Sequence, residues 1–242
     1  MSNLKGKTAI VTGSSRGIGR AIAERLAAAG AAVIVNYRDN AAAAAAVVDG
    51  IADRGGHALA VQADIAKVSD IKRLFDAAEA AFGAIDIVVA NASVVVIKPV
   101  IDSTEEDFDT VFAANARGTF FTMREAARRL RDGGRIVAVT TGGTRMFFGQ
   151  TALYLGSKGA VEQFVRVLSR EVGARRITVN AVLPGFTDTD MLPERDRKVA
   201  AGLSPFARIG RPEEVADVVA FLASEEAGWV TAQNIGAGGG VM

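Results

Sequence analysis

Thr12-Gly13-Ser14-Ser15-Arg16-Gly17-Ile18-Gly19 decides the fold, because this glycine-rich stretch joins an apolar run to an amphipathic helix. The run before it, Thr8–Val11, is rich in strand formers, and Gly17–Ala29 carries its apolar residues on one face. Glycines here permit a tight bend and a close approach of a phosphate to the backbone, and the helix offers free N–H groups and the positive end of its dipole. The stretch predicts a phosphate-binding turn, with a tight turn that holds no ligand as the alternative.

The rest of the chain repeats this alternation of short apolar runs and helical segments. Because the expected strands are apolar throughout, they are typical of a parallel sheet covered on both faces. We predict a single doubly wound α/β domain over residues 1–242, with a central parallel sheet of about seven strands and helices on both faces. The further strands are expected at Ala32–Asn36, Ala58–Gln62, Ile85–Ala90, Arg135–Thr140, Ile177–Leu183 and Ala232–Gly236, and the further helices at Asn40–Asp53, Ser69–Phe82 (capped by Ser69), Thr104–Leu130, Thr151–Val172 and Pro212–Ala223.

Composition narrows the class of protein. The chain has 242 residues, 50% of them hydrophobic, and its 28 basic and 27 acidic residues leave a net charge of +1. That charge gives no overall attraction to nucleic acid or to a membrane surface. The chain contains no cysteine, which excludes disulfides and thiolate metal sites, and we expect no metal. The polar stretch Met1–Lys7 does not look like a secretory signal, so a cytoplasmic protein is expected.

Tyr154-Leu155-Gly156-Ser157-Lys158 places a phenol and an ammonium one helical turn apart on the same face. A free phenol has a pKa near ~10, and a nearby cation lowers it. A tyrosine with such a partner can act as a general acid or base near neutral pH. The alternative is a surface tyrosine beside a solvated lysine.

The end of the second strand bears on which dinucleotide binds. Sites that prefer NAD carry an acid about 20 residues after the glycine turn, to bind the ribose 2′-hydroxyl. Here the strand ends in Asn36-Tyr37-Arg38, with no acid before Asp39. Arg38 and Arg16 could flank a 2′-phosphate, each charge-assisted bond being worth about 1.5–3 kcal/mol. We therefore predict a preference for NADP(H), with NAD(H) possible; two solvated arginines are the alternative.

Taken together, these motifs resemble the short-chain dehydrogenase/reductase family over essentially the whole chain. The glycine turn matches that family's Thr-Gly-x-x-x-Gly-x-Gly motif, and Tyr154 and Lys158 match its Tyr-x-x-x-Lys motif. The resemblance implies a Rossmann-type fold and an NADP(H)-dependent oxidoreductase that acts on a carbonyl or alcohol. It implies the catalytic residues Tyr154, Lys158, Thr141 and Asn115. It also implies cofactor contacts at Gly13, Ser15, Arg16, Gly17, Ile18, Gly19, Tyr37, Arg38, Asp64, Ile65, Asn91, Ala92, Tyr154, Lys158, Pro184, Gly185, Thr187 and Thr189.

Two positions depart from the family pattern. The family's Asn-Asn-Ala-Gly segment reads Ala90-Asn91-Ala92-Ser93 here, which keeps the central Asn-Ala pair. The family's catalytic serine, 13 residues before the tyrosine, is replaced by Thr141. A threonine hydroxyl donates the same hydrogen bond, but its methyl group restricts χ1. We expect activity to be kept, with a narrower pocket or a reduced rate.

The resemblance also implies a role for each catalytic residue. Tyr154 exchanges a proton with the substrate oxygen while hydride moves between the nicotinamide and carbon. Lys158 lowers the pKa of Tyr154 and holds the nicotinamide ribose, and Thr141 hydrogen-bonds the substrate oxygen. Asn115 anchors a water that links Lys158 to solvent.

The substrate is less well defined by the sequence. Apolar residues in segments near the expected nicotinamide suggest an apolar pocket under a lid at 186–210: Val94, Val95, Val96, Ile97, Met146, Phe147, Phe148, Phe186, Met191 and Leu192. For any single one of them, ordinary packing in the core or at a subunit interface is the better explanation. Arg145 could meet an acidic substrate group at the entrance, although a solvated arginine is the better explanation.

Three further expectations concern partners. An alternative function is a 3-oxoacyl-[acyl-carrier-protein] reductase, whose acidic carrier protein would dock on Arg124, Arg128, Arg129, Arg131 and Arg175; a solvated helix face explains the same arginines. A remote alternative is a non-catalytic NADP-binding sensor. The family resemblance implies a homotetramer built on Thr104–Leu130, Thr151–Val172 and Ala232–Met242, and Trp229 is expected to pack inside the protein.

Overall fold

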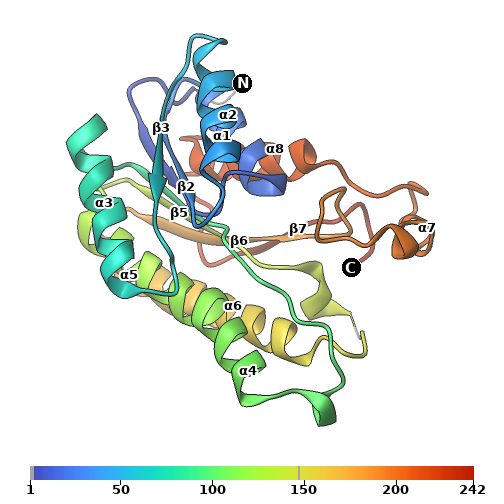
Figure 1. The fold of residues 1–242 in the computed structure, drawn as a ribbon. Helices are drawn as coiled ribbons and strands as arrows, with labels where there is room; N and C mark the ends of the chain where they lie inside the picture. Colours follow the sequence, from blue (N-terminus) through green and yellow to red (C-terminus); the bar gives the residue numbers. More distant parts are fainter. Residues whose placement is uncertain (1–2, 147) are drawn as a thin grey trace.

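A single parallel sheet forms the centre of the protein (Figure 1), as seen in a computed structural model that describes residues 3–146 and 148–242. Its strand order is β3-β2-β1-β4-β5-β6-β7, and every neighbouring pair is parallel. This confirms the predicted doubly wound α/β fold. The strands are β1 (Thr8–Val11), β2 (Ala32–Tyr37), β3 (His57–Gln62), β4 (Ile87–Ala90), β5 (Arg135–Val139), β6 (Thr178–Pro184) and β7 (Asn234–Ala237).

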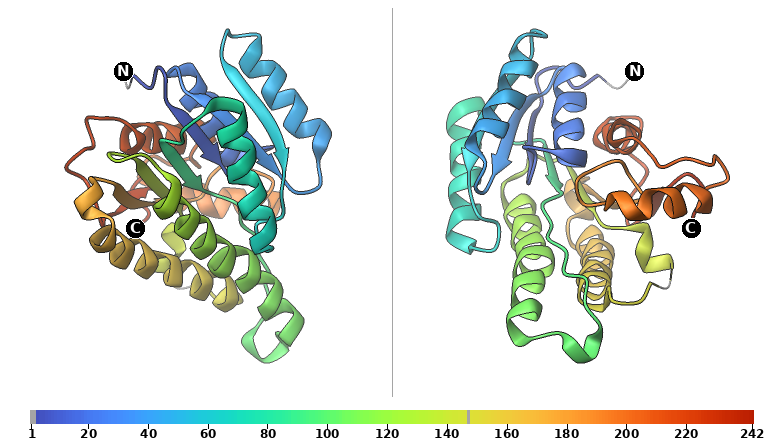
Figure 2. Two further views of the ribbon diagram at one scale, coloured as in Figure 1. Left: turned by 90° about the vertical axis from the view of Figure 1, so that its left-hand side faces the viewer. Right: turned by 45° about the vertical axis from the view of Figure 1, so that its right-hand side comes forward.

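Helices cover both faces of the sheet, as two views of the ribbon show (Figure 2). On one face lie α1 (Gly17–Ala28), α2 (Ala41–Ala52) and α8 (Pro212–Ala223). On the other lie α3 (Val68–Phe82), α5 (Thr119–Arg129) and α6 (Ala152–Glu171). The helix α4 (Glu105–Phe112) precedes α5 and extends beyond the sheet. Each face therefore has its own apolar core.

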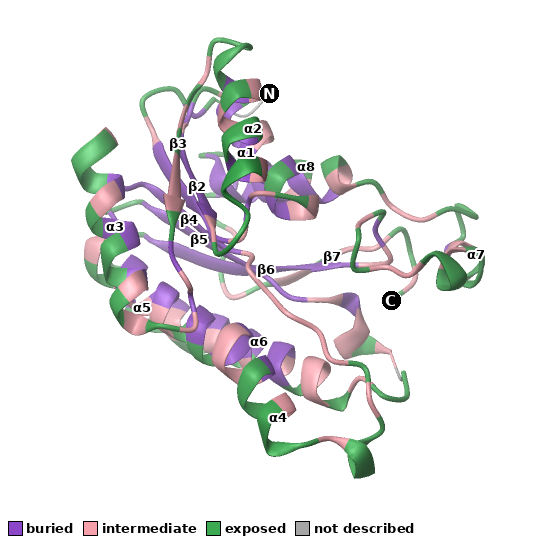
Figure 3. Cartoon of the chain, in the orientation of Figure 1, coloured by how far each residue is buried: buried purple, intermediate pink, exposed green. Residues whose placement is uncertain are grey.

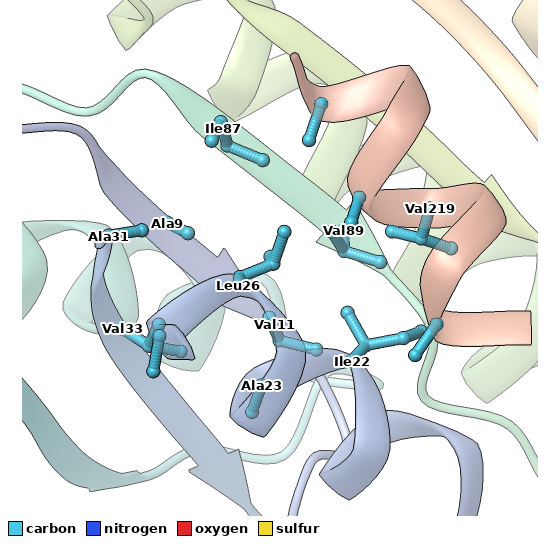
Figure 4. Close-up of a cluster of buried hydrophobic side chains, with 14 of the residues drawn as sticks. Ala9, Val11, Ile22, Ala23, Leu26, Ala31, Val33, Ile87, Val89 and Val219 are labelled. Atoms are coloured by element: carbon cyan, nitrogen blue, oxygen red, sulfur yellow. The ribbon is translucent and has the colours of Figure 1, made fainter. Parts of the chain in front are cut away.

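The apolar face of α1 that the sequence predicts packs into the core beneath α1 and α8 (Figure 4). Ile22 and Leu26 of α1 and Val219 of α8 pack over Val11 and Val89 of the central strands, and all five are fully buried. Burial of each large aliphatic side chain contributes about 1.5–3 kcal/mol. The inner strands form the buried layer, the edge strands β3 and β7 are only partly buried, and the outer helix faces are exposed (Figure 3).

Three predicted elements differ from the structure. The helix expected over Thr104–Leu130 begins with a Thr104–Asp107 capping box, but a π-helical turn at Ala113–Gly118 interrupts it. The segment 186–210, where we predicted a lid and no helix or strand, contains the helix α7 (Glu194–Leu203). Ser69 does not cap α3, because this helix already begins at Val68 after Lys67.

The position of Trp229 also differs from the prediction. This side chain, expected to pack inside the protein, is 99% exposed between α8 and β7.

The topology fixes where a ligand site can form. The chain winds outward from β1 through β2 to β3, then returns to start β4 on the other side of β1. Ligands bind at such a reversal, outside the carboxyl ends of the strands. The segments after β1, β4 and β5 meet at this edge. Within residues 3–146 and 148–242, no helix combines the length and apolar composition needed to cross a bilayer.

Candidate active site

Close packing explains the glycines of the turn after β1. Gly13 and Gly17 have φ of +63° and +54°, a left-handed conformation that glycine adopts without strain. A Cβ on Gly13 would lie 2.8 Å from the Cα of Ala92, and a Cβ on Gly19 would overlap the carbonyl oxygen of Gly13. The turn is therefore packed against both α1 and the segment after β4.

Side-chain amides fix this turn to its neighbours. Asn36 Oδ1 accepts from the Gly13 N–H at 3.0 Å, and Asn91 Nδ2 donates to Thr12 O at 2.9 Å. Thr12 Oγ1 accepts from the N–H groups of Asn91 and Ala92. The sequence reasoning missed Asn36. Its signal was an amide inside an apolar strand, since buried polar groups need hydrogen-bond partners.

The turn fits a phosphate. In the part of the chain that the structure describes, no side chain caps the N-terminus of α1, so the N–H groups of Gly17, Ile18 and Gly19 stay open to an anion. Arg16, directly before the helix, is exposed and lies 3.8 Å from Asp190. These groups can hold the pyrophosphate of a dinucleotide.

Charged side chains surround the carboxyl ends of β2 and β3. Arg38 donates from Nε to Asp39 at 2.6 Å, and both are exposed. Asp64 Oδ1 accepts from the Ala66 N–H, while Ile65 is buried against Gly118. The hollow here is lined by Arg38, Asp39, Gln62, Asp64, Lys67, Asp70 and Arg73. The predicted arginines therefore have different partners, since Arg16 pairs with Asp190 and Arg38 with Asp39.

The segment after β6 lies on the other side of the glycine turn. The Gly185 N–H donates to Ala237 O at 3.2 Å, and Thr187 is buried and bridges to Gly210. A Cβ on Gly17 would lie 3.4 Å from the methyl group of Thr189, so this segment touches the turn. The predicted contacts at Pro184–Thr189 are thus close to those at Gly13–Gly19.

Tyr154, near the start of α6, holds its phenol between two hydroxyl groups. Burial raises the pKa of Tyr154, while side-chain hydrogen bonds with Thr141 and Ser93 counteract the rise. Thr141 Oγ1 accepts from the Gly143 N–H at 3.1 Å, which leaves its own proton free to be donated. The methyl group of Thr141 does not prevent this contact with Tyr154.

Lys158 is buried one turn further along α6, with its Nζ 6.0 Å from the centroid of the Tyr154 ring. Burial lowers the pKa of Lys158 to about 8. Its ammonium donates to Val139 O at 2.8 Å rather than to the phenol. The net lowering of the Tyr154 pKa that we predicted is therefore not seen in this structure, because burial of the phenol dominates.

Asn115 lies in the π-helical turn and is fully buried. Its Oδ1 accepts from Ser93 Oγ and the Val94 N–H, and its Nδ2 donates to Val94 O and Ser157 Oγ, at 2.8–3.2 Å. These four bonds fill the capacity of an amide side chain. The side chain of Asn115 therefore has no free atom for the predicted water, and it connects the segment after β4 to α6.

Arg145, predicted to meet an acidic substrate group, is instead paired with a carboxylate of the protein. It donates to Glu162 Oε2 at 2.9 Å, and Glu162 is a buried carboxylate that also accepts from Thr144 at 2.6 Å and Asn234 at 2.9 Å. The same Thr144 hydroxyl lies 3.0 Å from Thr141 O. Glu162 thus fixes the turn that carries Thr141. No group of three metal-ligating side chains occurs within the described ranges.

The predicted apolar residues flank this site unevenly. Phe148 and Phe186 meet edge to face with their centroids 5.7 Å apart, which joins the loop before α6 to the segment after β6. Val94 to Val96 are half-buried, and Met191 is exposed. Phe147 lies outside the described residues.

Comparison with known proteins identifies the family. A sequence-family model described as enoyl-(acyl carrier protein) reductase matches residues 13–242. The short chain dehydrogenase claC of Passalora fulva is 46% identical over 98% of this chain and 95% of its own length. This chain belongs to the short-chain dehydrogenase/reductase family. It is therefore an oxidoreductase.

Two further proteins are similar to this chain over almost its whole length. The versicolorin reductase stcU of Emericella nidulans is 45% identical over 99% of this chain and 97% of its own length. The solved structure of the angucycline C-6 ketoreductase LanV with bound NADP is 44% identical, with a TM-score of 0.94, covering 99% of this chain and 97% of that one. LanV has also been solved with NADP and rabelomycin (43% identity, TM-score 0.92, covering 99% and 98%).

The titration of Lys158 tests the electrostatics of this site. Because burial disfavours the ammonium, the side-chain NMR signal of Lys158 should titrate near pH 8 in the protein without cofactor. The ammonium is present below that pH and lost above it. The signal is assigned by its absence in Lys158→Met. Titration at the ordinary lysine value would contradict the buried placement.

Proposed function

We propose that this short-chain oxidoreductase is an NADPH-dependent ketoreductase in which Tyr154 delivers the proton. The observation that carries the proposal is the phenol of Tyr154, held by the Thr141 hydroxyl beside the buried Lys158 ammonium. This cluster lies at the carboxyl edge of the sheet, next to a glycine turn that fits a phosphate. A proton donor beside a dinucleotide site is what carbonyl reduction requires.

Each residue contributes one part of the reduction. The raised pKa keeps Tyr154 protonated at neutral pH, ready to donate. Thr141 donates a hydrogen bond to the substrate oxygen as that oxygen gains charge, and Lys158 stabilises the phenolate left behind. Asn115 positions the segment after β4 against α6. When bound, the nicotinamide supplies the hydride.

The residues around the glycine turn are proposed to hold the cofactor. The open N–H groups of α1 bind the pyrophosphate. Arg38 gives up its ion pair with Asp39 and binds the 2′-phosphate instead. Asp64 and Ile65, which follow β3, are proposed to contact the adenine, and the Pro184–Thr189 segment, which lies beside the turn, is proposed to contact the nicotinamide. The bound NADP of LanV supports this choice of cofactor.

The substrate we propose is a ketone on a fused aromatic ring system. The names of the relatives support this, since they include an angucycline ketoreductase, a versicolorin reductase and a probable tetrahydroxynaphthalene reductase. The Phe148–Phe186 pair offers aromatic surface beside the site, and flat rings favour such edge and stacking contacts. The segment 186–210 is proposed as the lid.

The acyl-carrier alternative is not favoured. Most of the arginines expected to dock an acidic carrier are already paired within the chain: Arg129 with Asp76 at 2.8 Å, Arg131 with Asp86 at 3.4 Å and Arg175 with Asp132 at 2.8 Å. Arg124 and Arg128 share Glu125. Docking would have to compete with these pairs.

A homotetramer is also part of the proposal. Phe120 on α5 and Val167 on α6 are exposed by 45% and 58%, on two of the segments expected to form the interfaces, and Trp229, just before the third segment, is exposed by 99%. Large apolar side chains exposed on helix faces favour burial against another copy. The cytoplasmic location expected from the sequence stays a prediction.

Replacement of the proposed acid tests the function directly. Tyr154→Phe should reduce turnover of a fused-ring ketone by at least about 10²-fold, because the proton donor is lost. NADPH binding, measured by fluorescence titration, should be nearly unchanged. Substantial ketone reduction by this variant would remove Tyr154 from its role.

The preference for NADPH depends on Arg38 and its partner. Arg38→Ala should weaken NADPH relative to NADH by about 10-fold or more, since a charge-assisted hydrogen bond is lost. Asp39→Asn should strengthen NADPH relative to NADH, because it frees Arg38 and removes a negative charge that would repel the 2′-phosphate. The ratio of kcat/KM for the two cofactors measures both, with Arg54→Ala as the control. Equal kcat/KM for NADPH and NADH in the unaltered protein would contradict the assignment.

A further inference from the structure

Ser93 stands where the family pattern has glycine, and its hydroxyl reaches the centre of the site. Its Oγ donates to Asn115 Oδ1 at 3.2 Å and forms a side-chain hydrogen bond with Tyr154. The roles described above leave this hydroxyl unused. A glycine at this position would offer no group to either partner.

The hydroxyl is part of a closed ring of hydrogen bonds around Tyr154. From Ser93 the ring passes to Asn115, whose Nδ2 donates to Ser157 Oγ at 3.0 Å, and Ser157 donates to Tyr154 O at 2.7 Å. Ser157 and Asn115 are both fully buried. The ring thus holds Tyr154 at its phenol and at its backbone.

The donors and acceptors of the ring can be assigned from their partners. Asn115 Oδ1 only accepts, so the single proton of Ser93 is directed at Asn115. Ser93 Oγ therefore accepts from the phenol while Tyr154 is protonated. Thr141 is different, because its Oγ1 accepts from Gly143 and its proton points toward Tyr154.

We propose that Ser93 is a further catalytic residue, whose hydroxyl turns from Asn115 to the Tyr154 oxygen when the phenol gives up its proton. This inference rests on the proposed role of Tyr154. No covalent bond of Ser93 forms or breaks, because the proton leaves Tyr154 for the substrate oxygen and the Ser93 proton only changes its acceptor. The phenolate gains a hydrogen bond from Ser93, while the single proton of Thr141 is directed at the substrate oxygen.

The rotation leaves no buried polar atom without a partner. When Ser93 turns away, Asn115 Oδ1 keeps the bond from the Val94 N–H at 2.9 Å. The phenolate is the stronger acceptor of the two, since hydrogen bonds to an ionised oxygen are about twice as strong as neutral ones. The exchange therefore favours the charged state of Tyr154.

The chain offers a direct measurement, because Tyr37 and Tyr154 are its only tyrosines. In protein labelled at tyrosine ¹³Cζ and saturated with NADP⁺, the Tyr154 signal, assigned through Tyr154→Phe, should titrate at higher pH in Ser93→Ala and Ser93→Gly than in the unaltered protein. The kcat for ketone reduction should fall about 5- to 10-fold, as for the loss of one hydrogen bond, with the NADP⁺ dissociation constant unchanged.

The controls separate this role from a structural one. Ser93→Gly restores the family pattern and is expected to fold. Ser169→Ala removes a serine hydroxyl from the far end of α6, where it bonds only to Arg166 O, and should leave titration and kcat unchanged. An unchanged Tyr154 titration in both Ser93 variants would overturn the proposal. Full activity of Tyr154→Phe would instead overturn the proposed function, without affecting the NMR result.

Discussion

All strands of the sheet run in the same direction, and the rest of the structure depends on this constraint. Because the strands are parallel, the segments that follow β1, β4, β5 and β6 all emerge at one edge. The glycine turn, Asn91-Ala92-Ser93, Thr141 and the Pro184–Thr189 segment are therefore neighbours, although they are far apart in the chain. α6 then brings Tyr154 and Lys158 to the same edge from one face of the sheet. The topology alone thus brings the proposed proton donor next to the proposed phosphate-binding turn.

Buried and half-buried polar side chains hold these segments in place relative to one another. Asn36, Asn91 and Thr12 fix the glycine turn, Asn115 connects the segment after β4 to α6, and Glu162 holds the turn that carries Thr141. Each would be costly to bury without partners, by about 1–3 kcal/mol per unsatisfied group. Because the partners belong to different strands and helices, the bonds form only when the whole edge is assembled. This links the stability of the fold to the geometry of the site.

The sequence predicted the sheet, most helix boundaries and the residues that gather at its edge. These features are local, because apolar runs, glycine spacing and the Tyr-x-x-x-Lys spacing each act within a few residues. The rest depends on contacts between distant segments. The π-helical turn at Ala113–Gly118, the hydroxyl of Ser93 beside Tyr154 and the pairing of Arg145 with Glu162 cannot be read from spacing. The direction of the Tyr154 pKa was predicted wrongly for the same reason, since desolvation depends on everything packed around the phenol.

The central claim is that the Tyr154 phenol and the Thr141 hydroxyl share the oxygen of a carbonyl substrate beside the nicotinamide. A crystal structure with NADP⁺ and a fused-ring ketone tests it most directly. The account predicts the ketone oxygen within hydrogen-bond reach of both Tyr154 Oη and Thr141 Oγ1, about 2.6–3.2 Å from each. A phenol turned away from the nicotinamide ring, or a ketone oxygen bound by other residues, would contradict it.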